Sequence, residues 1–298
     1  MSAKALLRKT VLAGALAATA TAYAQAQPEP ASGFEAKQPF VAKLQVIVAA
    51  HPLAAEAGHA TLKRGGSALD AAISAQMVLN FVEPQSSGIG GGAFLLVWSA
   101  KKRRLYAYDG RETAPASANP DRFTDSRGLP LAPRDALENG RSVGVPGVLA
   151  ALELAHRRHG RLAWRELLQP AIRHADEGVA MPRRLHALLA WDGALREVPQ
   201  ARELYFDSAG RPRAAGSLLR NPALADTLRR IALGGARAFY EGEIARDIVN
   251  AVASHRRPGD VTESDLAAYR AIERKPLCGA YRKWRVCGMP PPSSGAVA

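Results

Sequence analysis

The chain has 298 residues, of which 47% are hydrophobic and 22% charged, so it can bury the core of one large domain or two small ones. Its formal net charge of +13 raises the question of a nucleic-acid partner. Arginine greatly outnumbers lysine, the basic residues are scattered, and there is no recognition motif or basic stripe with interleaved aromatic residues. This pattern favours a generally basic surface, and no nucleic-acid partner is expected.

Residues 1–26 are predicted to be a cleavable signal peptide. Three basic residues precede an apolar run over 11–22, and the small residues around its end offer a cleavage site. The apolar run is too short to span a bilayer, which needs about 20 residues, and no other stretch could span one. We therefore expect export in the bacterial style to the periplasm, and a mature chain of residues 27–298 without a membrane span.

The mature chain opens with a predicted strand and a predicted helix. Residues 44–50 are apolar except for Gln45, which is typical of a buried strand. A helix begins at His51-Pro52 and ends at 63–66, where the basic residues of its last turn are followed by glycine.

A second helix leads into a run of glycines. It opens with Ser67 and Asp70, an S-x-x-D capping pair, and its polar residues lie on two opposite sides, so the helix is expected to be mostly buried. Pro84 ends it. The order helix, glycine run, strand is the reverse of a phosphate-binding loop, in which glycines follow a strand and open a helix. The run at 87–92 is therefore interpreted as a flexible or tightly packed bend.

Further strands and helices follow along the chain. Residues 116–142 are rich in Pro, Asp, Arg and Gly and are expected to form a long surface connection, whereas 178–220 show only weak periodicity. The predicted strands lie at 93–98, 105–108 and, as a strand–turn–strand unit, 277–288; the predicted helices lie at 146–158, 164–177 (interrupted by Pro170), 221–234, 239–253 and 262–269. No internal repeat, low-complexity block or clear domain boundary is visible.

The stretch PQSSGIGGGAFLLVW, followed by DGRETAP, resembles the gamma-glutamyltranspeptidase family, whose members are also called glutathione hydrolases. Further motifs that match the family lie along the whole mature chain: AAHPLAAEAG, GGSALDAA, SVGVPGVLAALELAHRRHG, LLQPAI, AFYEGEIA, DLAAY and MPPPSSG. The resemblance implies an α+β fold, the αββα sandwich of an N-terminal-nucleophile hydrolase, here incomplete because the matches cover only the large-chain portion. In the family, one precursor cuts itself into a large and a small chain, and the new N-terminal Thr of the small chain is the nucleophile.

The catalytic groups that the resemblance implies lie outside these residues. The family's Thr, its oxyanion glycines and the groups that hold the glutamyl amine all follow the MPPPSSG motif, so residues 27–298 are expected to be a partial large-chain domain without a catalytic residue. The implied partners are the remainder of the large chain, the small catalytic chain and a small gamma-glutamyl substrate such as glutathione. Ser293 and Ser294 have no recognisable His or Asp arrangement beside them, so residues 290–295 are interpreted as a rigid turn that shapes one wall near the site.

Arg111 is the candidate substrate-binding residue. At the exit from a predicted strand, its guanidinium offers a planar fork of donors that suits a carboxylate in two-point contact. A structural ion pair with Asp109 or Glu112 is the alternative that the residues alone leave open. In the family, the arginine of the matching DGRE motif grips the alpha-carboxylate of the gamma-glutamyl group, and the resemblance implies that role for Arg111. It implies no cofactor and no metal.

A metal-binding alternative rests on two E-x-x-H patterns in predicted helices, Glu56 with His59 and Glu153 with His156. This is the spacing used by di-iron helical bundles. Such a bundle needs two more glutamates from two further helices and a core largely free of strands. The predicted strands argue against that architecture, so no metal site is expected.

Cys278 and Cys287 would lie opposite one another if Arg282-Lys283 were a two-residue hairpin loop. Counting outward from that turn places the two cysteines at a non-hydrogen-bonded pair, where side chains approach most closely. An oxidising compartment would then allow a disulfide. Arg-Lys is a poor two-residue turn, and relatives often have glycine at position 283, so the pairing stays open at this point.

The resemblance implies a gamma-glutamyltransferase or glutathione hydrolase, which would pass the glutamyl group of glutathione or a related amide to water or an acceptor amine. Two alternatives remain open. One is a cephalosporin- or glutaryl-type acylase of the same fold, which a site without the Arg111 contact would favour. The other is an inactive exported fragment, and with no nucleophile among its residues the chain alone is expected to be inactive.

Overall fold

The computed structural model describes residues 39, 41–191 and 193–295. By its internal contacts the chain divides into residues 1–41 and residues 42–298, and the fold given below is that of the second unit. The signal peptide predicted for residues 1–26 lies outside the described residues. Within the described ranges, none of the helices combines the length and the apolar character that a bilayer crossing requires.

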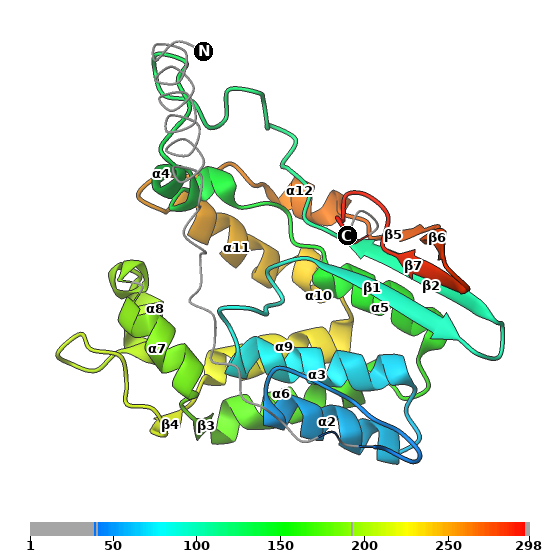
Figure 1. Cartoon of the computed structure of the whole chain (residues 1–298). Helices are drawn as coiled ribbons and strands as arrows, with labels where there is room; N and C mark the ends of the chain where they lie inside the picture. The colour runs from blue at the N-terminus through cyan, green and yellow to red at the C-terminus, as the bar shows by residue number, and fades with distance from the viewer. Residues whose placement is uncertain (1–38, 40, 192, 296–298) are drawn as a thin grey trace, which may run out of the picture. The chain divides into compact units, whose positions relative to one another are not determined.

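Four helices pack side by side, each against the next in the series α2 (Pro52–Lys63), α3 (Ala68–Val82), α6 (Trp164–Glu177) and α9 (Pro222–Gly234). They lie together in Figure 1. The predicted cap of α3 is confirmed, because the Asp70 amide donates to Ser67 Oγ (3.1 Å) and the Ser67 amide donates to Asp70 Oδ2 (2.8 Å). Ten of the 15 residues of α3 are buried, as its two-sided polar pattern predicted.

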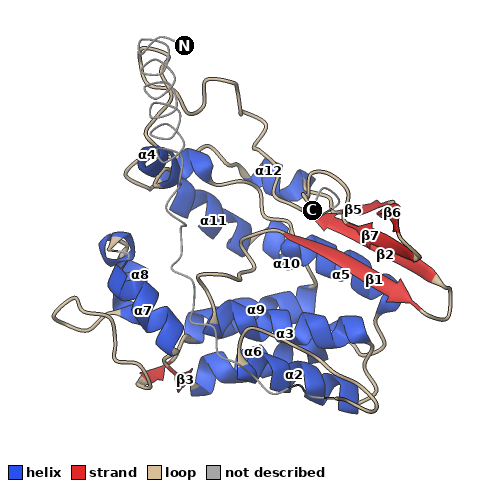
Figure 2. Cartoon of the chain, viewed as in Figure 1, coloured by secondary structure: helices blue, strands red, loops and turns tan. Residues whose placement is uncertain are grey.

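An antiparallel three-stranded sheet, ordered β1-β2-β5, packs against helix α5. These elements are β1 (Ala93–Ser99), β2 (Arg104–Gly110), β5 (Ile272–Arg274) and α5 (Val148–His159). Figure 2 shows the sheet in red with α5 beside it. Gly110, at the end of the central strand, allows this close packing, since a Cβ there would lie 2.5 Å from the Cβ of Ala151 in α5.

Short elements make up the rest of the described unit. They are α4 (Pro133–Leu137), η1 (Gly140–Ser142), β3 (Val179–Ala180), α7 (Arg183–Trp191), η2 (Ala194–Glu197), α8 (Pro199–Tyr205), β4 (Leu218–Leu219), α10 (Arg237–Tyr240), α11 (Glu243–Ala253), α12 (Glu263–Ala268), β6 (Leu277–Tyr281) and β7 (Trp284–Gly288). β3 pairs with β4, and β6 pairs with β7 as an antiparallel hairpin. The hairpin has the predicted register, with Cys278 opposite Cys287, and the two cysteines form a disulfide.

Three details of the predicted elements differ from the structure. Residues 239–253 are divided between α10 and α11, because Gly242 adopts a left-handed backbone (φ 81°) that interrupts the helix. Pro170 lies inside α6, which continues through it. The predicted connection at 116–142 contains the short helices α4 and η1.

The strand predicted at residues 44–50 is wrong for the described structure. This segment has no regular secondary structure, and Leu44 and Val48 are 97% and 89% exposed. Ile47 alone among its larger apolar side chains packs against the core, close to Gly58 of α2. A strand requires a hydrogen-bonded neighbour, and none of the described strands pairs with this segment, so an apolar pattern alone was not sufficient.

Candidate substrate-binding site

The glycine run turns the chain from α3 into β1 and is packed against the start of α5. The carbonyl oxygen of Gly91 accepts hydrogen bonds from the amides of Gly147 (3.0 Å) and Val148 (3.1 Å). A Cβ on Gly92 would lie 2.5 Å from Oε2 of Glu112 and 2.7 Å from the carbonyl oxygen of Gly110. Of the two forms of bend predicted, the tightly packed one is therefore present at Gly92.

Arg111 follows the last residue of β2, and its backbone is held at both ends. Its amide donates to Asp109 Oδ1 (2.9 Å), and its carbonyl oxygen accepts a hydrogen bond from the hydroxyl of Tyr269 (2.8 Å). Its side chain is 63% exposed. The fold thus fixes the position of the Arg111 backbone and leaves the guanidinium exposed.

Asp109 is buried, and its carboxylate forms an ion pair with a different arginine, Arg274. Its Oδ2 accepts a hydrogen bond from Nε of Arg274 in β5 (2.6 Å), while its Oδ1 caps the Arg111 amide. The pair joins the central strand to its neighbour across the sheet. The predicted alternative of an Arg111–Asp109 ion pair is therefore absent, because Asp109 bonds the backbone amide of Arg111 and not its guanidinium.

Glu112 supplies the ion pair that Arg111 does make. Its Oε2 lies 3.4 Å from Nε of Arg111, and its side chain is 31% exposed. Within the described part of the chain, this oxygen is buried and has no hydrogen-bond partner. The second predicted alternative, a contact with Glu112, is thus present as a loose ion pair at one nitrogen of the guanidinium.

Tyr269 anchors the carbonyl side of Arg111 from outside the sheet. Burial, together with the carboxylates of Asp109 and Glu112, raises the pKa of Tyr269 to about 12, so its hydroxyl stays protonated and can donate at neutral pH. Its ring stacks on Tyr240, with ring centres 5.7 Å apart and planes 6° from parallel. Tyr240 in turn donates to the carbonyl oxygen of Pro146 (2.9 Å).

The supporting residues escaped sequence reasoning for a common reason. Tyr269 lies 158 positions from its partner Arg111, and Arg274 lies 165 positions from Asp109. The only sequence signal was membership of motifs that match the family, DLAAY for Tyr269 and DGRETAP for Asp109, and Arg274 lies in neither. Neither motif reveals that the two segments meet.

Three of the other predicted chemistry-bearing residues, Glu153, His156 and Ser293, have structural partners. Glu153 Oε1 accepts a hydrogen bond from the Ala236 amide (2.9 Å), and His156 Nε2 lies 3.0 Å from the carbonyl oxygen of Leu162. Among the described residues, no group of three or more His, Cys, Asp or Glu side chains could hold a metal ion. Ser293 lies in the C-terminal turn, where its amide donates to the carbonyl oxygen of Pro290 (3.1 Å).

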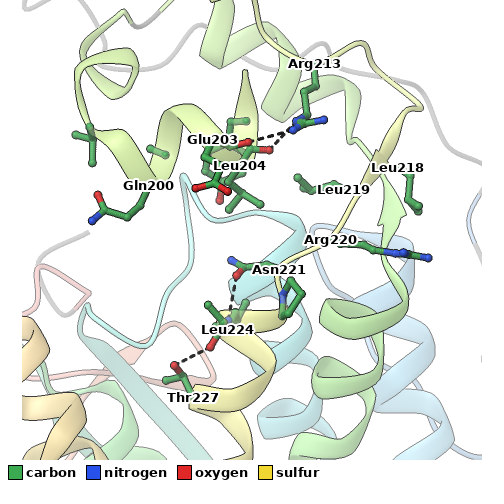
Figure 3. Close-up of a pocket in the computed structure, with 15 residues that line it drawn as sticks. Gln200, Glu203, Leu204, Arg213, Leu218, Leu219, Arg220, Asn221, Leu224 and Thr227 are labelled. Atoms are coloured by element: carbon green, nitrogen blue, oxygen red, sulfur yellow. Dashed lines mark hydrogen bonds between the residues drawn. The ribbon is translucent and has the colours of Figure 1, made fainter. Parts of the chain in front are cut away.

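A separate cavity of about 830 Å³ lies between α8 and the start of α9 (Figure 3). Several of its polar groups are engaged within the protein. Asn221 Oδ1 accepts the Leu224 amide (3.0 Å), and Arg213 donates to the backbone carbonyls of Leu204 (3.0 Å) and Glu203 (3.1 Å). None of the residues around Arg111 lines this cavity, so it is not part of the candidate site.

Solved structures define the class of protein. The gamma-glutamyltranspeptidase of Helicobacter pylori matches with a TM-score of 0.82 and 32% identity, covering 87% of this chain and 73% of that one. The cephalosporin acylase of Bacillus halodurans matches with a TM-score of 0.68 and 31% identity, covering 89% and 50%. These matches confirm the predicted α+β fold class, that of the N-terminal-nucleophile hydrolases.

The family follows from the sequence comparisons. The family model described as Gamma-glutamyltranspeptidase matches residues 54–298. The glutathione hydrolase proenzyme of Bacillus subtilis (strain 168) is 36% identical over 268 residues, which are 90% of this chain and 45% of that protein. The chain belongs to the gamma-glutamyltranspeptidase family, as its motifs predicted. It spans about half the length of the curated relatives that it matches.

Proposed function

We propose that this chain supplies the large-chain part of an enzyme that cleaves the gamma-glutamyl amide of glutathione and passes the glutamyl group to water or an acceptor amine. Membership of the family and relatives named glutathione hydrolase support this function. The nucleophilic Thr, the oxyanion donors and the groups that hold the glutamyl amine would come from sequence downstream of residue 298, as the remainder of the large chain and a small catalytic chain.

The observation that carries the proposal is the state of the Arg111 side chain. Its Nε has one loose contact with Glu112, and its two terminal nitrogens have no ion pair or hydrogen bond to any described residue. A guanidinium presented in this way can bind a carboxylate through two parallel hydrogen bonds. We propose that the carboxylate bound by Arg111 is the alpha-carboxylate of the gamma-glutamyl group.

The contribution of Arg111 to the reaction would be positional. A substrate held at its alpha-carboxylate has its gamma-carbonyl within the limited reach of the glutamyl chain from the anchor, which helps to place the carbonyl for attack by a nucleophile supplied elsewhere. Because the Arg111 backbone is already held by hydrogen bonds, substrate binding costs less conformational entropy at this residue. The oxygen of the nucleophile would bond to the amide carbon and the C–N bond would break, so that the amine, Cys-Gly in the case of glutathione, leaves with the proton that the nucleophile gives up. Water or an acceptor amine would then take the glutamyl group from the nucleophile.

The test is Arg111→Lys in protein made together with the downstream segment, assayed by release of a gamma-glutamyl anilide. Lysine keeps the charge and loses the planar fork, so kcat/KM should fall by about 30- to 150-fold, or about 2–3 kcal/mol. Self-cleavage into two chains should be largely intact. Arg64→Lys is a matched control, since Arg64 also makes one loose ion pair, with Glu166 at 3.9 Å. Wild-type kinetics in Arg111→Lys would reject the assignment.

An acylase of the same fold is the second candidate, favoured by the match to cephalosporin acylase. The Arg111 contact does not separate the two functions as first expected, because a glutaryl group also ends in a carboxylate. The two acyl groups differ in the alpha-amino group of the glutamyl moiety. We expect kcat/KM for the gamma-glutamyl anilide to exceed that for the glutaryl anilide, and the reverse order would identify an acylase.

We further propose that the chain is exported to the periplasm. The predicted signal peptide at residues 1–26 supports this location, and so does the Cys278–Cys287 disulfide, because disulfides persist in oxidising compartments. Fractionation of cells that express the natural gene should recover the protein in the periplasmic fraction with a new N-terminus near residue 25 or 27. Recovery in the cytoplasm with Met1 intact would contradict the proposal.

A further inference from the structure

The DLAAY motif, residues 265–269, forms most of helix α12 and includes Tyr269, the residue that caps the C-terminal end of this helix. Leu266, within the motif, is fully buried and belongs to the hydrophobic core, so the motif has a fixed position in the fold. Its two polar side chains, those of Asp265 and Tyr269, are four positions apart, which is about one helical turn.

Both of these polar side chains bond the segment that carries Arg111. The Tyr269 hydroxyl donates to the carbonyl oxygen of Arg111 (2.8 Å), and Asp265 Oδ1 accepts a hydrogen bond from the amide of Ala116 (2.9 Å). These bonds join positions that are 158 and 149 residues apart in the sequence. The DLAAY motif therefore holds the DGRETAP segment near both of its ends.

The Tyr269 hydroxyl passes a glycine to reach its acceptor. A Cβ on Gly147 would collide with this hydroxyl and with the carbonyl oxygen of Gly110. Tyr269 is buried, and its ring stacks on Tyr240, whose own hydroxyl bonds Pro146, the residue before Gly147. The stacked pair thus holds both Tyr269 and the turn that leaves room for it. All of these contacts join residues of this chain, so they do not depend on what sequence downstream of residue 298 covers.

The orientation of the Arg111 guanidinium depends on its backbone. Among the described residues, Glu112 is the only partner of the guanidinium, at 3.4 Å from Nε, and the Arg111 side chain is 63% exposed. A two-point contact requires both terminal nitrogens to face the two carboxylate oxygens. With so little contact at the side chain, the direction in which Arg111 projects is set mainly by the bonds that hold its backbone, and the Tyr269 bond is one of them.

We propose that Tyr269 is a positioning residue for the substrate carboxylate, acting through Arg111 without touching the substrate. This role rests on the proposed contact between Arg111 and the alpha-carboxylate. Without the Tyr269 bond, Arg111 has more conformational freedom before the substrate binds, and binding must then remove that freedom. The carboxylate contact is the same in the bound substrate and in the transition state, so KM rises and kcat is unchanged.

The test is steady-state kinetics of Tyr269→Phe, in protein made together with the downstream segment, with a gamma-glutamyl anilide as substrate. KM should rise about three- to tenfold, the cost of ordering one more side chain on binding, at unchanged kcat. Tyr205→Phe is the matched control, because Tyr205 is a partly buried tyrosine of α8 that lines the separate cavity, and its kinetics should equal those of the wild type. Thermal melts and the yield of self-cleaved chains verify that each variant is folded.

Combining Tyr269→Phe with Arg111→Lys shows whether the tyrosine acts through the arginine. If it does, adding Tyr269→Phe to Arg111→Lys should raise KM by less than about twofold, because the planar fork that the hydroxyl bond positions is already absent. A general weakening of the fold would instead multiply the two effects, since the free-energy changes of independent sites add.

Three results would overturn the positioning role. Wild-type KM in Tyr269→Phe, with Arg111→Lys impaired, would reject this role and leave the proposed function intact. Effects that multiply in the combined variant would give Tyr269 a purely structural role. Wild-type kinetics in Arg111→Lys would reject the proposed carboxylate contact itself, and the role of Tyr269 with it.

Discussion

The substitution Gly92→Ala tests whether the glycine run is fixed by close packing. The new methyl group would lie 2.5 Å from Oε2 of Glu112 and 2.7 Å from the carbonyl oxygen of Gly110, against an ordinary contact of 3.4–4 Å. The carboxylate of Glu112 can rotate away. The carbonyl of Gly110 cannot, because it belongs to the last register pair of β1 and β2. The backbone must therefore shift, and overpacking of this kind costs about 1–3 kcal/mol.

The matched control is Gly90→Ala, two residues earlier in the same run. A Cβ on Gly90 has no neighbour within 4 Å, and its backbone is not left-handed, so the change should stay within about 0.5 kcal/mol. Thermal melts should show Gly92→Ala about 3–9 °C below the wild type and Gly90→Ala close to it. Equal melting temperatures for the two variants would refute the argument that backbone approach requires glycine at position 92.

Three further outcomes are expected. The Arg122 guanidinium lowers the pKa of Asp260 to about 2, so this pair stabilises the fold above pH 4 and the stabilisation is lost as the pH falls from about 4 to about 2. The melting temperature of Arg122→Gln should therefore lie below that of the wild type at pH 6 and approach it at pH 2.5. A difference in melting temperature that does not change with pH would contradict this. Tyr269→Phe keeps the ring stack but loses the hydroxyl bond, so we expect a loss of about 1 kcal/mol in chemical denaturation, and no loss would mean that the hydroxyl contributes nothing. Thiol titration of the unfolded, unreduced protein should find no free thiol, since Cys278 and Cys287 are bonded, and two thiols would disprove the bond.

Features set by neighbours in sequence could be predicted, and features set by distant partners could not. The cap of α3 depends on residues three apart, and the cysteine pairing depends on counting outward from one turn, so both are local and both are confirmed. Strand formation at 44–50 depends on a partner strand, which an apolar pattern does not guarantee. Periodicity reports which face is buried, and it is silent about what pairs with an edge.

The candidate site, too, has a part that a local motif predicted and a part that depends on distant residues. The DGRE motif led to Arg111, and the residues alone left its partner open between a substrate, Asp109 and Glu112. The fold decides between the two carboxylates, because it brings Arg274 of β5 onto Asp109 and leaves Glu112 beside the Arg111 guanidinium. The sequence could not reveal this, because the pairing of β5 with β2 joins residues more than 160 positions apart.

The proposed role of Arg111 requires that a substrate carboxylate binds its guanidinium more strongly than Glu112 does. Glu112 contacts one nitrogen at 3.4 Å, and the Arg111 side chain is 63% exposed, so solvent screens the pair and it contributes at most about 1 kcal/mol. A substrate carboxylate in a two-point contact with the terminal nitrogens would gain about 1.5–3 kcal/mol through charged hydrogen bonds. The incoming group therefore does not need to displace a strong internal partner. Had Asp109 been free to take both terminal nitrogens, the internal pair would have competed on equal terms. The Asp109–Arg274 bond, by occupying that carboxylate, keeps Arg111 available.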